Sequence, residues 1–262
     1  IVGSVDAGIS AAAWSPDEEL LAITTQADTL LLMSRDIENI ATIALAPEDV
    51  NVSTHVSVGW GKKETQFKGK RARALQDPTV PEHIDAGELS PFDDRSVTIS
   101  WRGDGAYFAL TKVEQEQRRM IRVYSREGQL DSVSEPVDGL EGALSWRPSG
   151  NLIASVCRTS DKLEVVFFER NGLRHGQFDL RFTQVELAAL VTPLTVKWNS
   201  DSSVLSISFP DKVQLWTTSN YHYYLKQELV FPETATRTAL CTWHAERPLA
   251  VAISTPGMHK SD

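Results

Sequence analysis

The chain has 262 residues, with 26 basic and 35 acidic side chains and a formal net charge of −9, which argues against a surface that binds nucleic acid through bulk positive charge. Two cysteines, Cys157 and Cys241, are too few for a disulfide framework and indicate a reducing compartment. No run of about 18 apolar residues is present, and the opening residues lack the features of a signal peptide, so we expect an intracellular protein without a membrane span.

Residues 1–58 read as four short antiparallel strands joined by tight polar turns. Four such strands are the unit of a β-propeller blade. The expected strands are Ala11–Trp14, Leu20–Thr24, Thr29–Ser34 and Asn39–Leu45. A polar linker then leads to the first strand of a second unit, at His55–Trp60.

The stretch after Trp60 departs from this pattern. Instead of a turn and a strand, the chain carries an inserted charged loop at residues 62–96, with a basic first half and an acidic second half. Long insertions in repeat folds lie in loops on one face, often the binding face. The basic residues are Lys62, Lys63, Lys68, Lys70, Arg71 and Arg73, and the acidic residues are Glu82, Asp85, Glu88, Asp93 and Asp94.

Two interpretations of this insertion stay open. The six basic residues could form a patch that contacts RNA phosphate or an acidic partner. Alternatively, the insertion is a solvated loop whose basic half folds against its own acidic half. Composition alone favours the solvated loop, because the basic residues are not accompanied by a series of aromatic residues for base stacking.

Residues 97–140 and 141–190 carry the two clearest blades. In the second of them a strand ends at Trp146, a Pro-Ser-Gly turn follows, and three further short strands are separated by polar turns. The Arg-Glu-Gly turn at 126–128 recurs one blade later as Arg-Asn-Gly at 170–172. Glycine at the third position is typical of tight hairpin turns.

The last third of the chain repeats the pattern with two ambiguities. The apolar run Val185–Val191 fits either a connecting strand or a short helix. In the blade that starts at Val196, Trp216 ends a third-strand run as the signature tryptophan of WD40 repeats does. The aromatic residues Trp216, Tyr221, Tyr223 and Tyr224 lie close together. They could form a stacking platform, but in a propeller such clusters more often pack between blades.

A single period underlies these units. Successive blade tryptophans are separated by 46, 41, 45, 52 and 45 residues, which fits the roughly 40 to 45 residues of a WD40-type blade. The tryptophans are Trp14, Trp60, Trp101, Trp146, Trp198 and Trp243. The sequence therefore predicts an all-β, WD40-type β-propeller over residues 1–253, incomplete at five blades and part of another, with an unassigned tail at 254–262.

The residue types that enzymes use are not assembled into any recognisable motif. The six histidines are dispersed without metal-ligand spacing, and no serine nucleophile elbow or complete phosphate-binding or dinucleotide-binding loop occurs. Acidic pairs such as Asp17-Glu18 and Asp93-Asp94 fall in turns, where they are usually solvated. We therefore expect no catalytic residue, no metal and no cofactor, and hence no enzyme.

Several stretches are more specific than a generic blade. They are HVSVGWGKKETQFKGKRARA (55–74), VTISWRGDGAYFAL (97–110), LSWRPSGNLIAS (144–155), VVFFERNGLRHGQFDL (165–180) and VQLWTTSNYHYYLKQEL (213–229). Together they resemble the amino-terminal WD40 propeller of the largest, IKAP-type subunit of the Elongator complex, and the insertion looks most like fungal members of that family.

This resemblance implies a non-catalytic scaffold. By this resemblance, the scaffold would hold a catalytic radical-SAM and acetyltransferase-like subunit and a second propeller subunit in an assembly that modifies the wobble uridine of tRNA at carbon 5. The resemblance further implies a cytoplasmic and also nuclear protein that dimerises through a region outside this chain, and a tRNA contact by the basic residues would fit it. The alternative is a peptide-recognition propeller in another multiprotein assembly, although the turns after the tryptophans differ too much to form a repeated ring of binding residues.

Overall fold

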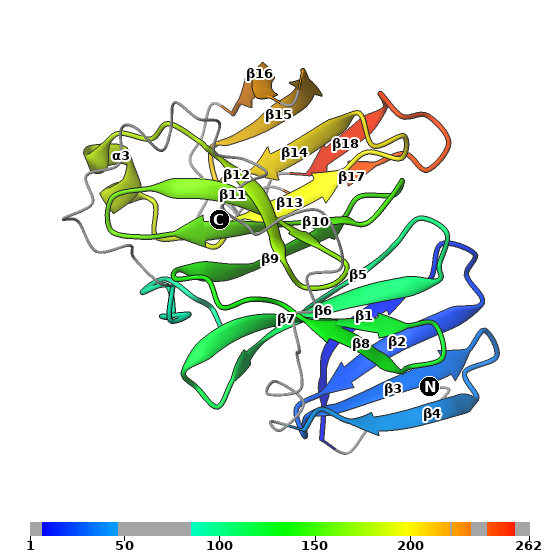
Figure 1. The fold of residues 1–262 in the computed structure, drawn as a ribbon. Helices are drawn as coiled ribbons and strands as arrows, with labels where there is room; N and C mark the ends of the chain where they lie inside the picture. Colours follow the sequence, from blue (N-terminus) through cyan, green and yellow to red (C-terminus); the bar gives the residue numbers. More distant parts are fainter. Residues whose placement is uncertain (1–6, 47–84, 221, 232–239, 255–262) are drawn as a thin grey trace, which may run out of the picture.

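The computed structural model describes residues 7–46, 85–220, 222–231 and 240–254 (Figure 1). These residues form four four-stranded antiparallel sheets and one two-stranded sheet. This arrangement confirms the predicted all-β fold and the incomplete propeller. The described residues account for four blades and part of a fifth, with the blade of β1 directly beside the blade of β5. The predicted strand at His55–Trp60 and the tail at 255–262 lie outside the described residues.

Each four-stranded sheet is one blade, with its strands in sequence order. The first blade contains β1 (Ile9–Trp14), β2 (Leu20–Thr25), β3 (Thr29–Ser34) and β4 (Asn39–Ala44). The second contains β5 (Thr98–Trp101), β6 (Tyr107–Glu114), β7 (Arg118–Ser125) and β8 (Leu130–Val133). The third contains β9 (Leu140–Trp146), β10 (Leu152–Arg158), β11 (Leu163–Glu169) and β12 (Arg174–Asp179). The fourth contains β13 (Thr195–Trp198), β14 (Val204–Ser208), β15 (Lys212–Ser219) and β16 (His222–Val230), and the two-stranded sheet contains β17 (Leu240–Trp243) and β18 (Val251–Ser254).

The first strand of each blade lies beside the first strand of the next, from β1 to β5, β9, β13 and β17. The last strands, such as β4 and β16, lie at the outside (Figure 1). The hydrophobic core is therefore distributed over the seams between blades. One cluster joins the first two blades around Trp101 and Phe108, and another joins the third and fourth around Phe167 and Trp198.

The blade tryptophans help to fix these seams. Trp101 Nε1 donates a hydrogen bond to the carbonyl of Ala13, in the first strand of the preceding blade, at 3.0 Å. Trp243 Nε1 makes the equivalent bond to the carbonyl of Lys197 at 3.2 Å. Trp14 is 43% exposed, because no blade precedes its own among the described residues. An indole is large and apolar with one donor, so it suits a seam that also presents a backbone acceptor.

Two sequence expectations are refined by the structure. The ambiguous run at 185–191 contains a short helix, α3 (Gln184–Ala189), which begins with a capping box between Thr183 and Glu186. Trp216 does not end its strand, since β15 continues to Ser219. Trp216 pairs with Leu225 of β16, directly beside a β-bulge in this pair of strands.

The recurring glycine turns close the outer hairpins of two blades. Gly128 and Gly172 both have φ of +83°, a left-handed conformation that favours glycine. Each turn carries a backbone hydrogen bond of 2.9 Å, from Gly128 to Ser125 and from Gly172 to Glu169. A Cβ on Gly172 would lie 2.1 Å from the carbonyl oxygen of Val133, so this turn touches the backbone of the preceding blade.

We expect Gly172→Ala to destabilise the protein much more than Gly150→Ala. Both glycines have positive φ, and a Cβ on Gly150 meets nothing within 4 Å, so the Gly150 variant should lose only about 1–2 kcal/mol from backbone strain. The Gly172 variant should lose roughly 1–3 kcal/mol more from the clash with Val133. The free energies of unfolding in urea test this, and equal losses would contradict a tight seam.

Candidate functional site

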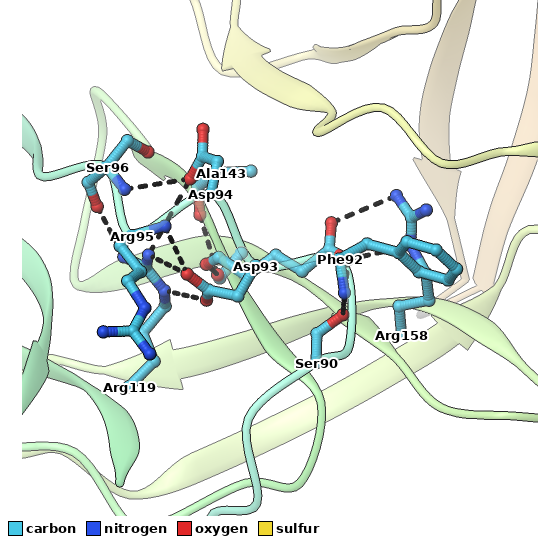
Figure 2. Close-up of polar contacts among 11 residues, drawn as sticks. Ser90, Phe92, Asp93, Asp94, Arg95, Ser96, Arg119, Ala143 and Arg158 are labelled. Carbon is cyan, nitrogen blue, oxygen red and sulfur yellow. Dashed lines mark hydrogen bonds and ion pairs between the residues drawn. The ribbon is translucent and has the colours of Figure 1, made fainter. Parts of the chain in front are cut away.

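A segment without regular secondary structure, Asp85–Ser96, crosses the second and third blades before β5 begins. We call it the acidic strap, because it contains Asp85, Glu88, Asp93 and Asp94. It is the described part of the charged insertion, and Figure 2 shows contacts of its residues 90–96. Such a segment must find hydrogen-bond partners outside itself, and the strap finds them on both blades.

The first part of the strap, residues 85–88, is held mainly by the turn that precedes β9. Asp138 Oδ1 accepts hydrogen bonds from the backbone N–H groups of Gly87, at 2.6 Å, and Glu88, at 2.8 Å. The N–H of Gly139 donates in return to the carbonyl of Glu88 at 2.7 Å. Asp85 accepts from Arg174 Nη1 at 2.8 Å, which ties the start of the described strap to β12. Backbone and side-chain contacts therefore both fix this part of the strap.

The last part of the strap, residues 93–96, carries a bidentate ion pair. Arg119 Nε and Nη2 donate to the two carboxylate oxygens of Asp93 at 2.6 and 2.7 Å, and Nη1 donates to the carbonyl of Ser96 at 2.8 Å (Figure 2). The side chains of Arg119 and Asp93 are 0% and 3% exposed, respectively. Asp94 lies farther away, at 3.9 Å, and is 38% exposed. The planar guanidinium matches a carboxylate in this two-bond geometry.

A second buried pair joins the strap to the third blade. Glu141 Oε1 lies 2.8 Å from Arg158 Nε and accepts a hydrogen bond from Ser90 Oγ at 2.9 Å. The Arg158 guanidinium also donates to the carbonyls of Leu190 and Thr192 and stacks over the ring of Phe92. Burial raises the pKa of Glu141 to about 7 and lowers that of Arg158, because both charges are removed from water.

These contacts make a clamp that holds the strap on the second and third blades. Burial raises the pKa of the Cys157 thiol to about 12, so it is protonated at neutral pH and is a poor nucleophile. In the parts of the chain that the structure describes, no three His, Cys, Asp or Glu side chains are grouped to hold a metal ion. Over the same residues, no helix is long and apolar enough to cross a membrane. The arrangement can hold two blades and a loop in one fixed geometry.

The sequence-predicted site residues divide into two groups. The six basic residues of the insertion lie outside the described residues, so their predicted contact with RNA or a partner stays a prediction. In the acidic half, Asp85 and Asp93 pair with Arg174 and Arg119 of the blades. Among the described residues, these two acids therefore have their partners on the propeller.

Sequence reasoning missed the arginines that hold the strap. Arg119 lies within RRMIRVYS and Arg158 ends LIASVCR, and most residues of both strands are buried. A charged residue at a strand position with buried neighbours requires a buried partner, and this was the available signal. The sequence could not indicate which acid supplies it.

The aromatic residues of the fourth blade mostly pack between blades, as the sequence favoured. The Tyr223 ring stacks on Phe178 and Phe167, with centroids 4.6 and 4.9 Å apart, and Phe178 lies 4.7 Å from Trp216. Tyr224 differs, since 51% of it is exposed. Tyr221 lies outside the described residues.

Asp93→Asn should destabilise the protein by about 3–5 kcal/mol, because it leaves the buried Arg119 guanidinium without its counter-charge. The neighbouring Asp94→Asn should cost less than about 1 kcal/mol, since that carboxylate is exposed and distant. Chemical denaturation of both variants tests the difference. If the Asp93 variant were as stable as the Asp94 variant, the strap would not depend on the buried pair.

Glu141 should make the free energy of unfolding fall as pH rises from about 4.5 to about 7. Its pKa is raised from 4.5 to about 7 in the folded protein, so the folded state binds the proton more tightly and loses that advantage as the pH passes through this window. Unfolding followed between pH 4.5 and 8 should show this slope in the natural protein and a smaller slope in Glu141→Gln. An identical slope in both proteins would contradict the assignment.

Comparison with known proteins agrees with the architecture. WD40 domains are similar in fold, including that of Toxoplasma gondii coronin, with a TM-score of 0.51 and 9% identity over 86% of this chain and 46% of that chain. A chain from the complex of KlAtg21 with the coiled coil of AgAtg16 gives a TM-score of 0.58 and 10% identity over 94% of this chain and 62% of that chain. At these identities the likeness supports the fold alone.

Sequence comparison is more specific. Elongator complex protein 1 of Schizosaccharomyces pombe is 48% identical over 97% of this chain, and that of Saccharomyces cerevisiae is 44% identical over 98%. The mouse protein is 46% identical over 89% of this chain. The chain spans only 20%, 21% and 18% of these three relatives. The model of the first N-terminal β-propeller of ELP1 matches residues 1–246, and the chain therefore belongs to that family.

Proposed function

We propose that this propeller is a non-catalytic part of an Elongator scaffold subunit and supports modification of the tRNA wobble uridine at carbon 5. The family match carries the proposal. The geometry is consistent with it, since the two buried ion pairs at the strap hold the strap on the second and third blades. Rigid blades with fixed loops present a large surface at little ordering cost on binding, which suits a scaffold.

The proposal includes specific partners. The scaffold would hold the catalytic radical-SAM and acetyltransferase-like subunit and a second propeller subunit, and would dimerise through a region outside this chain. Its place of action would be the cytoplasm and also the nucleus. These statements rest on the family resemblance, because the chain spans about a fifth of its Elongator relatives.

The basic residues of the insertion are proposed to contact tRNA. They are Lys62, Lys63, Lys68, Lys70, Arg71 and Arg73. With a net charge of −9 over the whole chain, RNA binding would require a local concentration of positive charge such as this one. Phosphate contacts of this kind depend strongly on salt.

The scaffold proposal predicts the effect of removing residues 1–254 from the full-length protein. The truncated subunit should retain less of the catalytic subunit in affinity purification, and carbon-5 modification of wobble uridine in cellular tRNA should fall. Mass spectrometry of tRNA nucleosides and of the purified assembly measures both. Unchanged modification and unchanged composition would refute a supporting role for this propeller.

The tRNA proposal predicts that changing the six basic residues to Ser weakens tRNA binding by the assembled complex. Each lost phosphate contact should also flatten the plot of log affinity against log salt by about 0.7–0.9. A charge control is Arg35, Lys162 and Lys197 changed to Ser, since these three side chains are exposed on other loops and strands. If the control variant loses as much affinity per charge as the insertion variant, the insertion has no specific contact with tRNA.

A further inference from the structure

The turn between β9 and β10 carries an arginine without an acidic partner among the described residues. The guanidinium of Arg147 stacks over the ring of Trp198 in the fourth blade, with its Cζ 5.4 Å from the ring centroid. Arg147 Nε is buried and finds no hydrogen-bond acceptor in the described parts of the chain. Asp201, in the neighbouring turn, accepts a hydrogen bond from the N–H of Ser203 at 3.0 Å and makes no ion pair with Arg147. We call this stacked arginine the Arg147 anchor.

The preceding blade satisfies the equivalent arginine internally. Arg102 and Arg147 each follow a blade tryptophan, in the sequences WRGDG and WRPSG. Arg102 Nε and Nη2 donate to the two carboxylate oxygens of Asp104 at 2.8 and 2.6 Å. The residue equivalent to Asp104 in the third blade is Ser149, which has no carboxylate. The same position therefore carries a paired guanidinium in one blade and an unpaired guanidinium in the next.

The Arg147 anchor is fixed before any partner arrives. The N–H of Arg147 donates to the carbonyl of Leu152 at 2.8 Å across its own hairpin. The N–H of Ser149 donates to Ser202 Oγ, in the neighbouring turn of the fourth blade, at 2.9 Å. Stacking on Trp198 holds the plane of the guanidinium. A partner group therefore does not have to order this side chain on binding, which removes part of the entropic cost of association.

The chemistry of the anchor fits one carboxylate. The Nη groups of Arg147 are not buried, and the planar fork of a guanidinium matches a carboxylate. Since part of the cation is withdrawn from water against Trp198, its attraction for a carboxylate is stronger than that of a fully solvated arginine. A single cation does not make the run of positive charge that binding of an RNA backbone requires. Ser149 and Gly150 are exposed beside it, so the backbone of a partner segment can approach.

We propose that the Arg147 anchor binds the carboxylate of an Asp or Glu side chain from a partner protein. That carboxylate plays the role that Asp104 plays for Arg102 in the preceding blade. Arginine and tryptophan are among the residues that contribute most to protein interfaces, and here they form one unit. The inference deepens the proposed scaffold function and rests on it, because it assigns one point at which the scaffold holds a partner.

Site-specific photo-cross-linking of the assembled complex tests the proposal. The full-length subunit carries p-benzoylphenylalanine in place of Ser149, and mass spectrometry identifies the segment that it captures. We expect a protein segment that contains Asp or Glu. The control position is Ser160, which is exposed in the turn between β10 and β11 at the other end of the blade and should not capture that segment. Capture of tRNA, or of no segment, would overturn the proposal.

Two substitutions then test the ion pair with the purified cross-linked protein. Arg147→Gln should weaken its binding to the full-length subunit by at least roughly tenfold, because the partner carboxylate loses its counter-charge. Ser149→Asp should weaken binding comparably while keeping Arg147, because it supplies an internal carboxylate as Asp104 does for Arg102. The matched control Ser160→Asp adds the same charge elsewhere on the blade and should leave binding unchanged.

A charge exchange separates the ion pair from a loss of folding. Arg147→Glu should abolish binding, and changing the captured acid of the partner to Arg should restore it. Urea unfolding of Ser149→Asp should show no loss of stability. Binding by Arg147→Gln and Ser149→Asp as tight as by the Ser160→Asp control would refute the anchor.

The outcomes for the anchor and for the scaffold are distinguishable. If the assembly depends on residues 1–254 but the Arg147 and Ser149 variants bind normally, the anchor proposal fails and the scaffold proposal stands. If the cross-linked protein binds as predicted but removal of residues 1–254 leaves the assembly unchanged, the scaffold proposal fails and the anchor serves a different partner.

Discussion

The structure depends on keeping its buried cations paired with carboxylates. Arg119 pairs with Asp93 of the strap, and Lys112 Nζ in the second blade lies 2.7 Å from Asp28 in the first. The guanidinium of Arg122 lies 2.9 Å from Glu114 and also donates to the carbonyl of Ala46. A buried cation without its partner is strongly destabilising. The Asp93 pair therefore fixes the strap on the second blade, and the Asp28 pair links the first blade to the second.

The sequence predicted the repeated architecture well because that information is local. A tryptophan, a polar turn and an apolar strand recur at one period, and turn glycines such as Gly128 and Gly172 reflect a requirement of their own backbone. The strap could not be predicted in the same way, because the strand around Arg119 indicates that a buried partner is needed but does not indicate that Asp93 supplies it. The helix α3 stayed ambiguous because six residues contain too little of any period to separate helix from strand.

The positions of paired and unpaired charges suggest a division of roles on one rigid body. At the strap, the Asp93–Arg119 and Glu141–Arg158 pairs are buried, so this region fixes geometry. At the seam of the third and fourth blades, Arg147 has no acidic partner among the described residues, so this region has a charge left to pair. A scaffold needs both properties, because a binding residue holds a partner in a defined place only when the body that carries it is stiff.

The close approach of Gly172 to Val133 has an evolutionary consequence. At this point the second and third blades meet through backbone atoms, so their spacing is set by a contact that contains no side chain. Substitutions in the apolar seam beneath it cannot be accommodated by moving the blades closer together there. Amino-acid substitutions in that seam should therefore occur in compensating pairs that keep the total side-chain volume constant. The outer surfaces of the same blades are under no such constraint and can diverge to bind different partners.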